Sequence, residues 1–238
     1  MIDYLTRFFT AYGRLLFDGT LDTLRMVFIS TAFAYVLGLP VGVGLVLTEQ
    51  YLHTDADASV PGAGRATVRA LRAFLGFIVN VGRSIPFIIL LIALLPFTQF
   101  VVGTRLGVRA TIVPLTVGAI PFVARLVEQS IREIPAGIME AATAMGSTRW
   151  QLVTRVILPE SVPSLIMGVA LTLITLIGYS AMAGAVGGGG LGDIAIRYGY
   201  HRYQADVMLW TIAILVILVQ VIQSLGSQLA RRVDKRRL

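Results

Sequence analysis

Long stretches without charged residues alternate with polar, arginine-containing segments along the chain. A membrane-spanning helix needs about 20 mostly apolar residues. Five stretches that lack Asp, Glu, Lys and Arg come close to this length or exceed it: Met26–Thr48, Ser84–Thr104, Ala110–Ala124, Ser161–Gly192 and Val207–Ala230. The pattern predicts five transmembrane helices, over about residues 22–47, 74–97, 109–127, 163–184 and 206–229.

The third of these stretches is the shortest and carries Pro114, Gly118 and Pro121, which weaken an isolated helix. In a helix bundle, neighbouring helices can satisfy the backbone groups that a proline leaves free. The alternative is a re-entrant segment buried inside the protein, because the charge-free core is shorter than a span usually needs.

Three further segments flank or interrupt the predicted spans. Residues 1–20 carry apolar residues at helical spacing, interrupted by Arg7 and Arg14, and this predicts a separate interfacial helix. Residues 21–229 then form the transmembrane domain, and residues 230–238 form a basic cytoplasmic tail. Residues 53–67 are rich in Ala, Asp, Gly and Pro, which predicts a flexible connection.

The composition agrees with a membrane location. Hydrophobic residues make up 56% of the chain, and the mean hydropathy is +0.80. Only 14% of the residues are charged, whereas an average soluble domain has about 25%. A soluble fold cannot bury so much apolar surface beneath a polar exterior. The predicted fold class is therefore an all-α integral membrane protein.

The placement of positive charges predicts the orientation in the membrane. If the tail is cytoplasmic, five spans also place residues 48–73 and 128–162 on that side. Together with Arg83 and Arg125 at the adjoining span ends, these regions hold 13 of the 20 Lys and Arg residues. Because cytoplasmic loops carry an excess of Lys and Arg, the sequence predicts an outside N-terminus and a cytoplasmic C-terminus.

Several kinds of chemistry have no basis in the sequence. The chain has no cysteine and only two histidines, which lie far apart, so no metal site and no cofactor is predicted. Its one lysine, Lys235, lies outside any glycine-rich turn, so ATP hydrolysis would need a separate chain. No catalytic set stands out. The charge nearest a span core, Arg83, either takes part in ion coupling or, in the alternative, snorkels or pairs with a carboxylate such as Glu128.

The segment between the third and fourth predicted spans has the clearest local signals. Pro135 suits the start of a helix over residues 136–145, because a missing N–H costs nothing there. Gly146 suits the left-handed position that ends such a helix. Thr148 with Gln151 forms a capping-box pattern for a second helix.

The second helix is expected to end where Pro159 and Pro163 interrupt the backbone hydrogen bonds. The segment is thus predicted to form a helix-turn-helix on the cytoplasmic surface, with small residues that allow close approach by another protein. Glu140, Arg149 and Trp150 offer specific contacts. An ordinary amphipathic loop is the alternative, and spacing alone does not decide between them.

The same segment resembles a known motif. Glu140-Ala141-Ala142, then Gly146 and Val156-Ile157-Leu158-Pro159, is similar to the EAA loop of ABC importer permeases, with Val156 where the family pattern has Ile. The resemblance implies a type I ABC importer permease fold and a coupling helix that docks on a separate ATP-binding subunit. The residues that it assigns to ATPase coupling are Glu140, Ala141, Ala142, Met145, Gly146, Leu158 and Pro159.

Three other segments, Arg83–Leu90, Ile112–Ala119 and Gly178–Gly192, are similar to the methionine-importer permeases. This resemblance implies a transport subunit rather than an enzyme, located in the bacterial inner membrane, that carries D- or L-methionine or a close analogue. It also implies a second copy of the chain, two ATP-binding subunits and an extracytoplasmic binding protein as partners, with membrane lipid around them and no nucleic acid. An ABC permease for another small solute, or a channel or carrier that works without ATP, remains the alternative.

The uncharged segment 178–192 is the candidate for the translocation path. Five of its residues are proposed to line or gate that path: Tyr179, Ser180, Met182, Gly187 and Gly188. The alternative is ordinary helix packing, since Gly, Ala and Ser are frequent where membrane helices touch.

Overall fold

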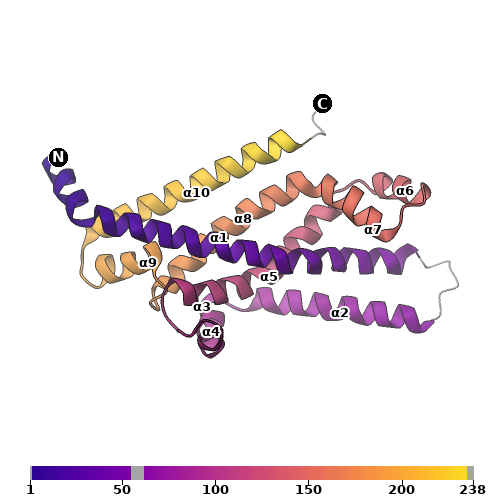
Figure 1. Cartoon of the computed structure of the whole chain (residues 1–238), viewed down its shortest axis with the longest axis horizontal. Helices are drawn as coiled ribbons and strands as arrows, with labels where there is room; N and C mark the ends of the chain where they lie inside the picture. Colours follow the sequence, from indigo (N-terminus) through magenta and orange to yellow (C-terminus); the bar gives the residue numbers. More distant parts are fainter. Residues whose placement is uncertain (1, 55–61, 235–238) are drawn as a thin grey trace. The chain divides into compact units, whose positions relative to one another are not determined.

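The computed structural model describes residues 2–54 and 62–234 of the chain, and all regular secondary structure in these residues is helical (Figure 1). The described residues divide into two compact units, which are treated separately below. Unit 1 comprises residues up to Phe33, Ile85–Gly118 and Leu171–Ser224. Unit 2 comprises Ala34–Ser84, Ala119–Ala170 and residues from Leu225 onward.

The α-helices are α1 (Ile2–Thr54), α2 (Gly62–Ser84), α3 (Phe87–Ala93), α4 (Leu95–Val102), α5 (Val108–Arg132), α6 (Ala136–Ala144), α7 (Arg149–Gln151), α8 (Leu158–Gly184), α9 (Gly190–Ile194) and α10 (Ala205–Val233). Two π-helical segments, η1 (Leu152–Ile157) and η2 (Ala195–Tyr200), lie between them. Among the described residues, four helical segments are long and apolar enough to cross a membrane, or five if the interrupted pair α2 and α3 counts as one. The predicted all-α membrane fold is confirmed.

The N-terminal region differs from the prediction, because α1 begins at Ile2 and continues without a break past residue 20 into the first predicted span. Its polar residues are satisfied along the helix itself. The hydroxyl groups of Thr20 and Thr23 donate to carbonyl oxygens one turn earlier, at 2.7 and 2.9 Å. Arg14 and Asp18 pair one turn apart, at 3.9 Å. No helix break is therefore needed where the hydrophobic pattern is interrupted.

The predicted span 74–97 is also wrong as a single helix, since α2 ends at Ser84 and α3 begins at Phe87. Pro86 has no backbone N–H, and it disfavours the helical conformation at the residue before it. Its own backbone is extended, with ψ of 131°, and its carbonyl accepts the N–H groups of Ile89 and Leu90 at 3.0 and 3.1 Å. The residue that breaks one helix thus begins the next.

The fifth helix is simpler than its sequence suggested. α5 runs unbroken over 25 residues, although it contains Pro114, Gly118 and Pro121. It is long and apolar enough to cross a membrane, so the re-entrant alternative is not what the structure shows. The predicted connection 53–67 is shorter than expected, because Thr54 ends α1 and residues 62–67 belong to α2; residues 55–61 lie outside the described residues.

Pro159 and Pro163 do not end the helix after Gly146, contrary to the prediction. The chain passes from α7 through η1 into α8, with both prolines inside α8. π-Helical bonding pairs a carbonyl with the N–H five residues on instead of four. At the end of η1 the N–H of Leu158 donates to the carbonyl of Val153, five residues earlier, so the wider turn lies just before Pro159.

Each unit has its own apolar core. In unit 1, buried side chains from α1, α9 and α10 form one cluster, which consists of Phe8, Leu16, Leu191, Ile194 and Val207. In unit 2, Leu45 of α1, Val79 of α2 and Ala124 of α5 pack together.

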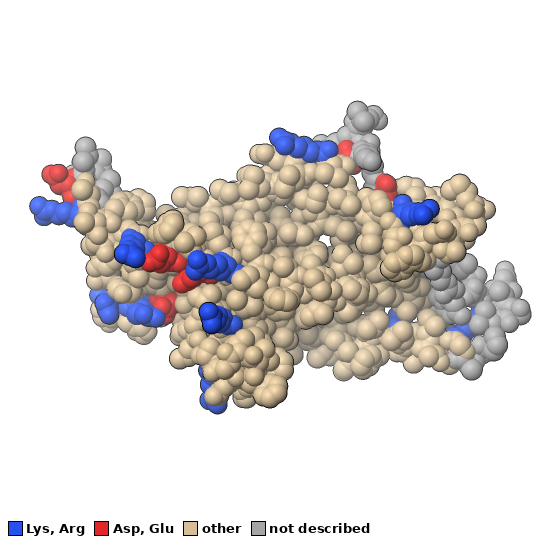
Figure 2. All heavy atoms as spheres, in the orientation of Figure 1, with Lys and Arg blue, Asp and Glu red and all other residues tan. Residues whose placement is uncertain are grey.

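Much apolar surface nevertheless stays exposed. Only 17% of the most apolar stretch of α10 is buried within the chain. Figure 2 shows one face of the molecule, on which charged groups occupy small areas and most of the surface carries no charge. An apolar exterior of this kind suits lipid or a partner chain rather than water.

Candidate functional site: the loop between α5 and α8

The loop that carries the predicted coupling residues lies in unit 2 and holds α6, α7 and η1 (Figure 1). Pro135 immediately precedes α6, with φ of −56° and ψ of 132°, and its carbonyl accepts the N–H of Ile138 at 3.1 Å. α6 then packs against η1. The predicted helix over residues 136–145 is confirmed, one residue shorter at its end.

Gly146 ends α6 as the sequence predicted. Its φ is +79°, in the left-handed region. The N–H of Gly146 donates to the carbonyl of Thr143 at 2.9 Å, and the N–H of Ser147 donates to the carbonyl of Ala142 at 3.2 Å. These are the two bonds of a Schellman motif, which satisfy carbonyls that the helix end leaves free.

The capping box after Gly146 is also confirmed. The backbone N–H of Thr148 donates to Gln151 Oε1 at 2.9 Å, and the N–H of Gln151 donates to Thr148 Oγ1 at 3.3 Å. Reciprocal bonds of this type start a helix at a defined residue. The turn between α6 and α7 is therefore fixed at both ends by hydrogen bonds.

The surface of this loop is distinctive for what it exposes. Met145 is 80% exposed and Trp150 is 76% exposed, while Glu140 and Ala141 are exposed beside them. Large apolar side chains on a polar loop are typical of a protein contact site. We therefore take these four side chains as the face that a partner can reach.

Ala142, another of the predicted coupling residues, is only 3% exposed within the chain, so its side chain is not part of this exposed face. The same holds in part at the start of α8, where Leu158 is half-buried while Pro159 is exposed. The motif thus contains both packing residues and surface residues, a division that its sequence did not reveal.

For Arg83, the structure bears only on the alternative that it pairs with Glu128. Arg83 is exposed and does not pair with Glu128. Both oxygens of the Glu128 carboxylate are taken by other arginines, at 2.6 Å from Arg125 and 2.7 Å from Arg132. The i,i+3 and i,i+4 spacing of these three residues on α5 was a signal that the sequence analysis missed.

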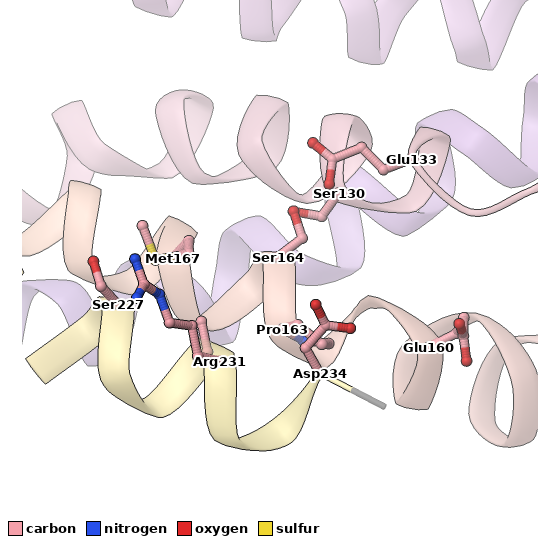
Figure 3. A pocket seen from close by; sticks show the side chains of 10 residues that line it. Ser130, Glu133, Glu160, Pro163, Ser164, Met167, Ser227, Arg231 and Asp234 are labelled. Atoms are coloured by element: carbon pink, nitrogen blue, oxygen red, sulfur yellow. The ribbon is translucent and has the colours of Figure 1, made fainter. Parts of the chain in front are cut away.

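A polar cavity of about 460 Å³ lies in the same unit, between α5, α8 and α10 (Figure 3). Three carboxylates, one arginine and three serines line it: Glu133, Glu160, Asp234, Arg231, Ser130, Ser164 and Ser227. Pro163, Met167 and Ala230 complete the lining. The polar lining sets this side of the helices apart from the apolar exterior. No group of three or more metal-ligating side chains occurs among the described residues.

The candidate path residues in unit 1 do not form one open surface. The ring of Tyr179 stacks on that of Phe87, with centroids 4.4 Å apart and planes 2° apart. Ser180 is 2% exposed, and its hydroxyl donates to the carbonyl of Ile177 at 2.8 Å. Met182 is half exposed and is the side chain of the group most available to a permeating solute.

The glycines that follow pack closely against other helices of unit 1. A Cβ on Gly188 would lie 2.7 Å from Thr111 Oγ1, and that hydroxyl donates to the carbonyl of Gly188 at 3.1 Å. The carbonyl of Gly187 accepts the N–H of Gly107 at 2.9 Å. The close approach of Thr111 to Gly188 is the kind of contact that the packing alternative describes.

The comparison with known proteins identifies the family. Residues 58–238 match the binding-protein-dependent transport system inner membrane component family. The chain belongs to this family. It is thus a multi-pass inner-membrane subunit of a transport system and not an enzyme, as predicted.

Relatives and solved structures agree with this assignment. The chain is 48% identical over 232 residues to the "Probable D-methionine transport system permease protein MetI" of Vibrio cholerae. This match covers 98% of each of the two chains. It is 54% identical over 219 residues to the protein of that name in Pasteurella multocida, and this match covers 92% of this chain and 95% of the relative. A solved structure described as an inward-facing conformation of the MetNI methionine ABC transporter is 47% identical, with a TM-score of 0.83 over 94% of this chain and 99% of that one.

Proposed function

We propose that this chain is the permease subunit of an ATP-driven importer of methionine or a close analogue. Two copies would form the translocation path, and each would bind one ATP-hydrolysing subunit, while an extracytoplasmic binding protein delivers the substrate. The substrate and the partners are supported by the names of relatives that are about half identical to this chain over nearly its whole length.

The observation that carries the coupling role is the rigid, exposed loop of α6, Gly146 and α7. Its turn is held by a Schellman motif and a capping box. Its surface offers one carboxylate, Glu140, beside the apolar side chains Met145 and Trp150. We infer that this face sits in a cleft of the ATPase, with Ala142 behind it as a packing residue. Leu158 and Pro159 would fix the start of α8, which carries the motion onward.

Two variants test the coupling role, Gly146→Val and Glu140→Lys. The first strains a left-handed backbone position, and the second reverses a charge at the proposed contact. Both should insert into the membrane normally, yet yield less complex with the ATPase and lose ATP-dependent methionine uptake. Arg14→Gln, which removes one charge from the exposed Arg14–Asp18 pair of unit 1, is the control. Full complex yield and uptake in both loop variants would contradict the coupling role.

The substrate is tested separately by measuring uptake of methionine and of other amino acids by the assembled complex. Uptake of another solute in place of methionine would identify a permease of different specificity. Uptake that persists without ATP would point instead to an independent carrier or channel.

We propose that the N-terminus lies outside and the C-terminus in the cytoplasm, with residues 1–20 at the outer interface and residues 230–238 as a cytoplasmic tail. The excess of Lys and Arg in the segments on the tail's side supports this orientation. Because the chain has no cysteine, single cysteines report accessibility cleanly. In intact cells an impermeant thiol reagent should label Ala195→Cys and spare Lys235→Cys; the reverse pattern would invert the topology.

The translocation path is proposed to pass Met182, with Tyr179, Ser180, Gly187 and Gly188 acting as the packed wall behind it. The exposed side chain of Met182 supports this role. Met182→Trp should obstruct uptake while the ATPase remains bound. Normal uptake in this variant would remove Met182 from the path.

A further inference from the structure

An unbroken alternation of positive and negative side chains joins three helices of unit 2. We call it the ion chain; in order, it consists of Arg72 of α2, Glu49 of α1, and Arg132, Glu128 and Arg125 of α5. Its members come from positions more than 80 residues apart in the sequence, as for Glu49 and Arg132. It is therefore a tertiary feature rather than a property of one helix.

Both carboxylates of the ion chain are fully engaged. Glu49 Oε1 lies 3.0 Å from Arg72 Nη2, and Glu49 Oε2 lies 2.6 Å from Arg132 Nη2. The same Arg132 nitrogen lies 2.7 Å from Glu128 Oε1, so one guanidinium bridges two helices. The last contact of the ion chain joins Arg125 Nη1 to Glu128 Oε2, at 2.6 Å.

Burial sets these contacts apart from ordinary surface ion pairs. The side chain of Glu128 is only 6% exposed and that of Glu49 is 24% exposed, so solvent screens them incompletely. A buried carboxylate that loses one partner keeps an uncompensated charge. The three helices are therefore held in one arrangement more firmly than isolated exposed pairs would hold them.

The middle member of the ion chain, Arg132, lies close in sequence to the proposed coupling helix. Arg132 is the last residue of α5, and Pro135 directly precedes α6. The short link is itself bonded, with the N–H of Glu133 donating to the carbonyl of Gln129 at 3.2 Å and the N–H of Ile134 to that of Ile131 at 3.1 Å. Ile134 is 4% exposed. A displacement of α6 is therefore transmitted to Arg132 through a link that is held by hydrogen bonds.

We propose that Glu49 and Arg132 are positioning residues that make the parts of α1, α2 and α5 joined by the ion chain move together when the ATPase displaces α6. This inference rests on the proposed function, because it requires that α6 is the element that the ATPase moves. Without the ion chain, α6 would still dock and ATP would still be hydrolysed. Less of the displacement would then reach α1 and α2, so fewer substrate molecules would be carried for each ATP.

The test measures methionine uptake per ATP hydrolysed by the complex of this chain with its ATPase in liposomes. Glu49→Gln removes the central charge but keeps the side chain's size. Complex yield and the rate of ATP hydrolysis should stay within about two-fold of the wild type, while uptake per ATP falls about five-fold or more, the lower end of common coupling between sites. Glu49→Asp keeps the charge and should restore most of the ratio.

Two more variants sharpen the result. Arg72→Gln detaches only α2 and should lower uptake per ATP by less than Glu49→Gln does, about two-fold. Asp22→Asn also removes one carboxylate from α1, where Asp22 pairs with Arg25 at 3.4 Å outside the ion chain, and should leave the ratio unchanged.

An unchanged ratio in Glu49→Gln overturns the proposal while leaving the proposed function intact. A parallel loss of complex yield, melting temperature and ATP hydrolysis in Glu49→Gln, with the ratio unchanged, also overturns it, because the ion chain would then serve stability alone. Absence of ATP-dependent methionine uptake by the wild-type complex overturns the proposed function and this inference with it.

Discussion

Gly146 and Gly190 have nearly the same left-handed backbone, with φ of +79° and +74°, in opposite surroundings. A Cβ added to Gly146 would meet no atom within 4 Å. One added to Gly190 would lie 2.6 Å from Thr23 Oγ1 and 2.8 Å from Met26 Cε. Gly146 is needed only for the left-handed turn of the backbone, whereas Gly190 also permits α1 and α9 to touch.

The comparison separates two kinds of region. The loop of Gly146 is stabilised by bonds within a few residues, and its outer face remains free for a partner. The turn at Gly190 is closed inside unit 1, where Thr23 Oγ1 accepts the N–H of Leu191 at 2.9 Å. A glycine with a left-handed backbone can thus lie either in a turn with an exposed outer face or at a place where two helices approach closely.

The largest effect is expected from Gly190→Ala. Strain at a left-handed position and overpacking against Thr23 and Met26 should together destabilise the protein by about 2–5 kcal/mol. The melting temperature of the purified permease in detergent measures this loss. An effect no larger than that of the same change at Gly146 would contradict the packing argument.

Gly146→Ala should cost less, about 1–2 kcal/mol, because only the backbone strain applies. The loss should be confined to the loop, so that hydrogen exchange of the α6 amides becomes faster while the melting temperature changes little. Gly103→Ala is the matched control, since Gly103 has φ of +77° and no atom within 4 Å of its added Cβ, but lies in unit 1. It should leave exchange in α6 unaltered.

Thr148→Ala should cost about 1 kcal/mol, since it removes one of the two capping-box bonds. The backbone N–H of Gln151 loses its acceptor, Thr148 Oγ1, and should exchange faster. Thr154→Ala is the control, because the Thr154 hydroxyl bonds only to the carbonyl of Trp150 at 2.8 Å, four residues earlier. Equal effects of the two changes would mean that the cap does not set the turn.

The smallest effect, and the only favourable one, is expected at Gly137. It lies inside α6 with no atom within 4 Å of an added Cβ, and its φ is not left-handed. Gly137→Ala should stabilise α6 by up to about 0.5–1 kcal/mol, because alanine loses less conformational entropy in a helix. Slower amide exchange in α6 would be the sign. Faster exchange would show that the space around residue 137 is already filled.

Features that depend on neighbours a few residues away could be predicted from the sequence alone. The uncharged stretches predicted the membrane helices. Gly146, Thr148 and Gln151 predicted the turn after α6, because the hydrogen bonds of this turn join residues three to five positions apart. The same short-range pattern carried the resemblance that led to the family.

Contacts between distant groups could be found only in the folded structure. It assigned Glu128 to Arg125 and Arg132 instead of Arg83, and it brought Glu49 to Arg132 across 83 positions. Helix continuity also escaped the sequence, because a proline breaks a helix or lies within it according to the hydrogen bonding around it. At Pro86 the backbone is extended and α2 has ended, whereas Pro159 lies inside α8, just after a π-helical segment. Such outcomes depend on packing between segments that no local pattern encodes.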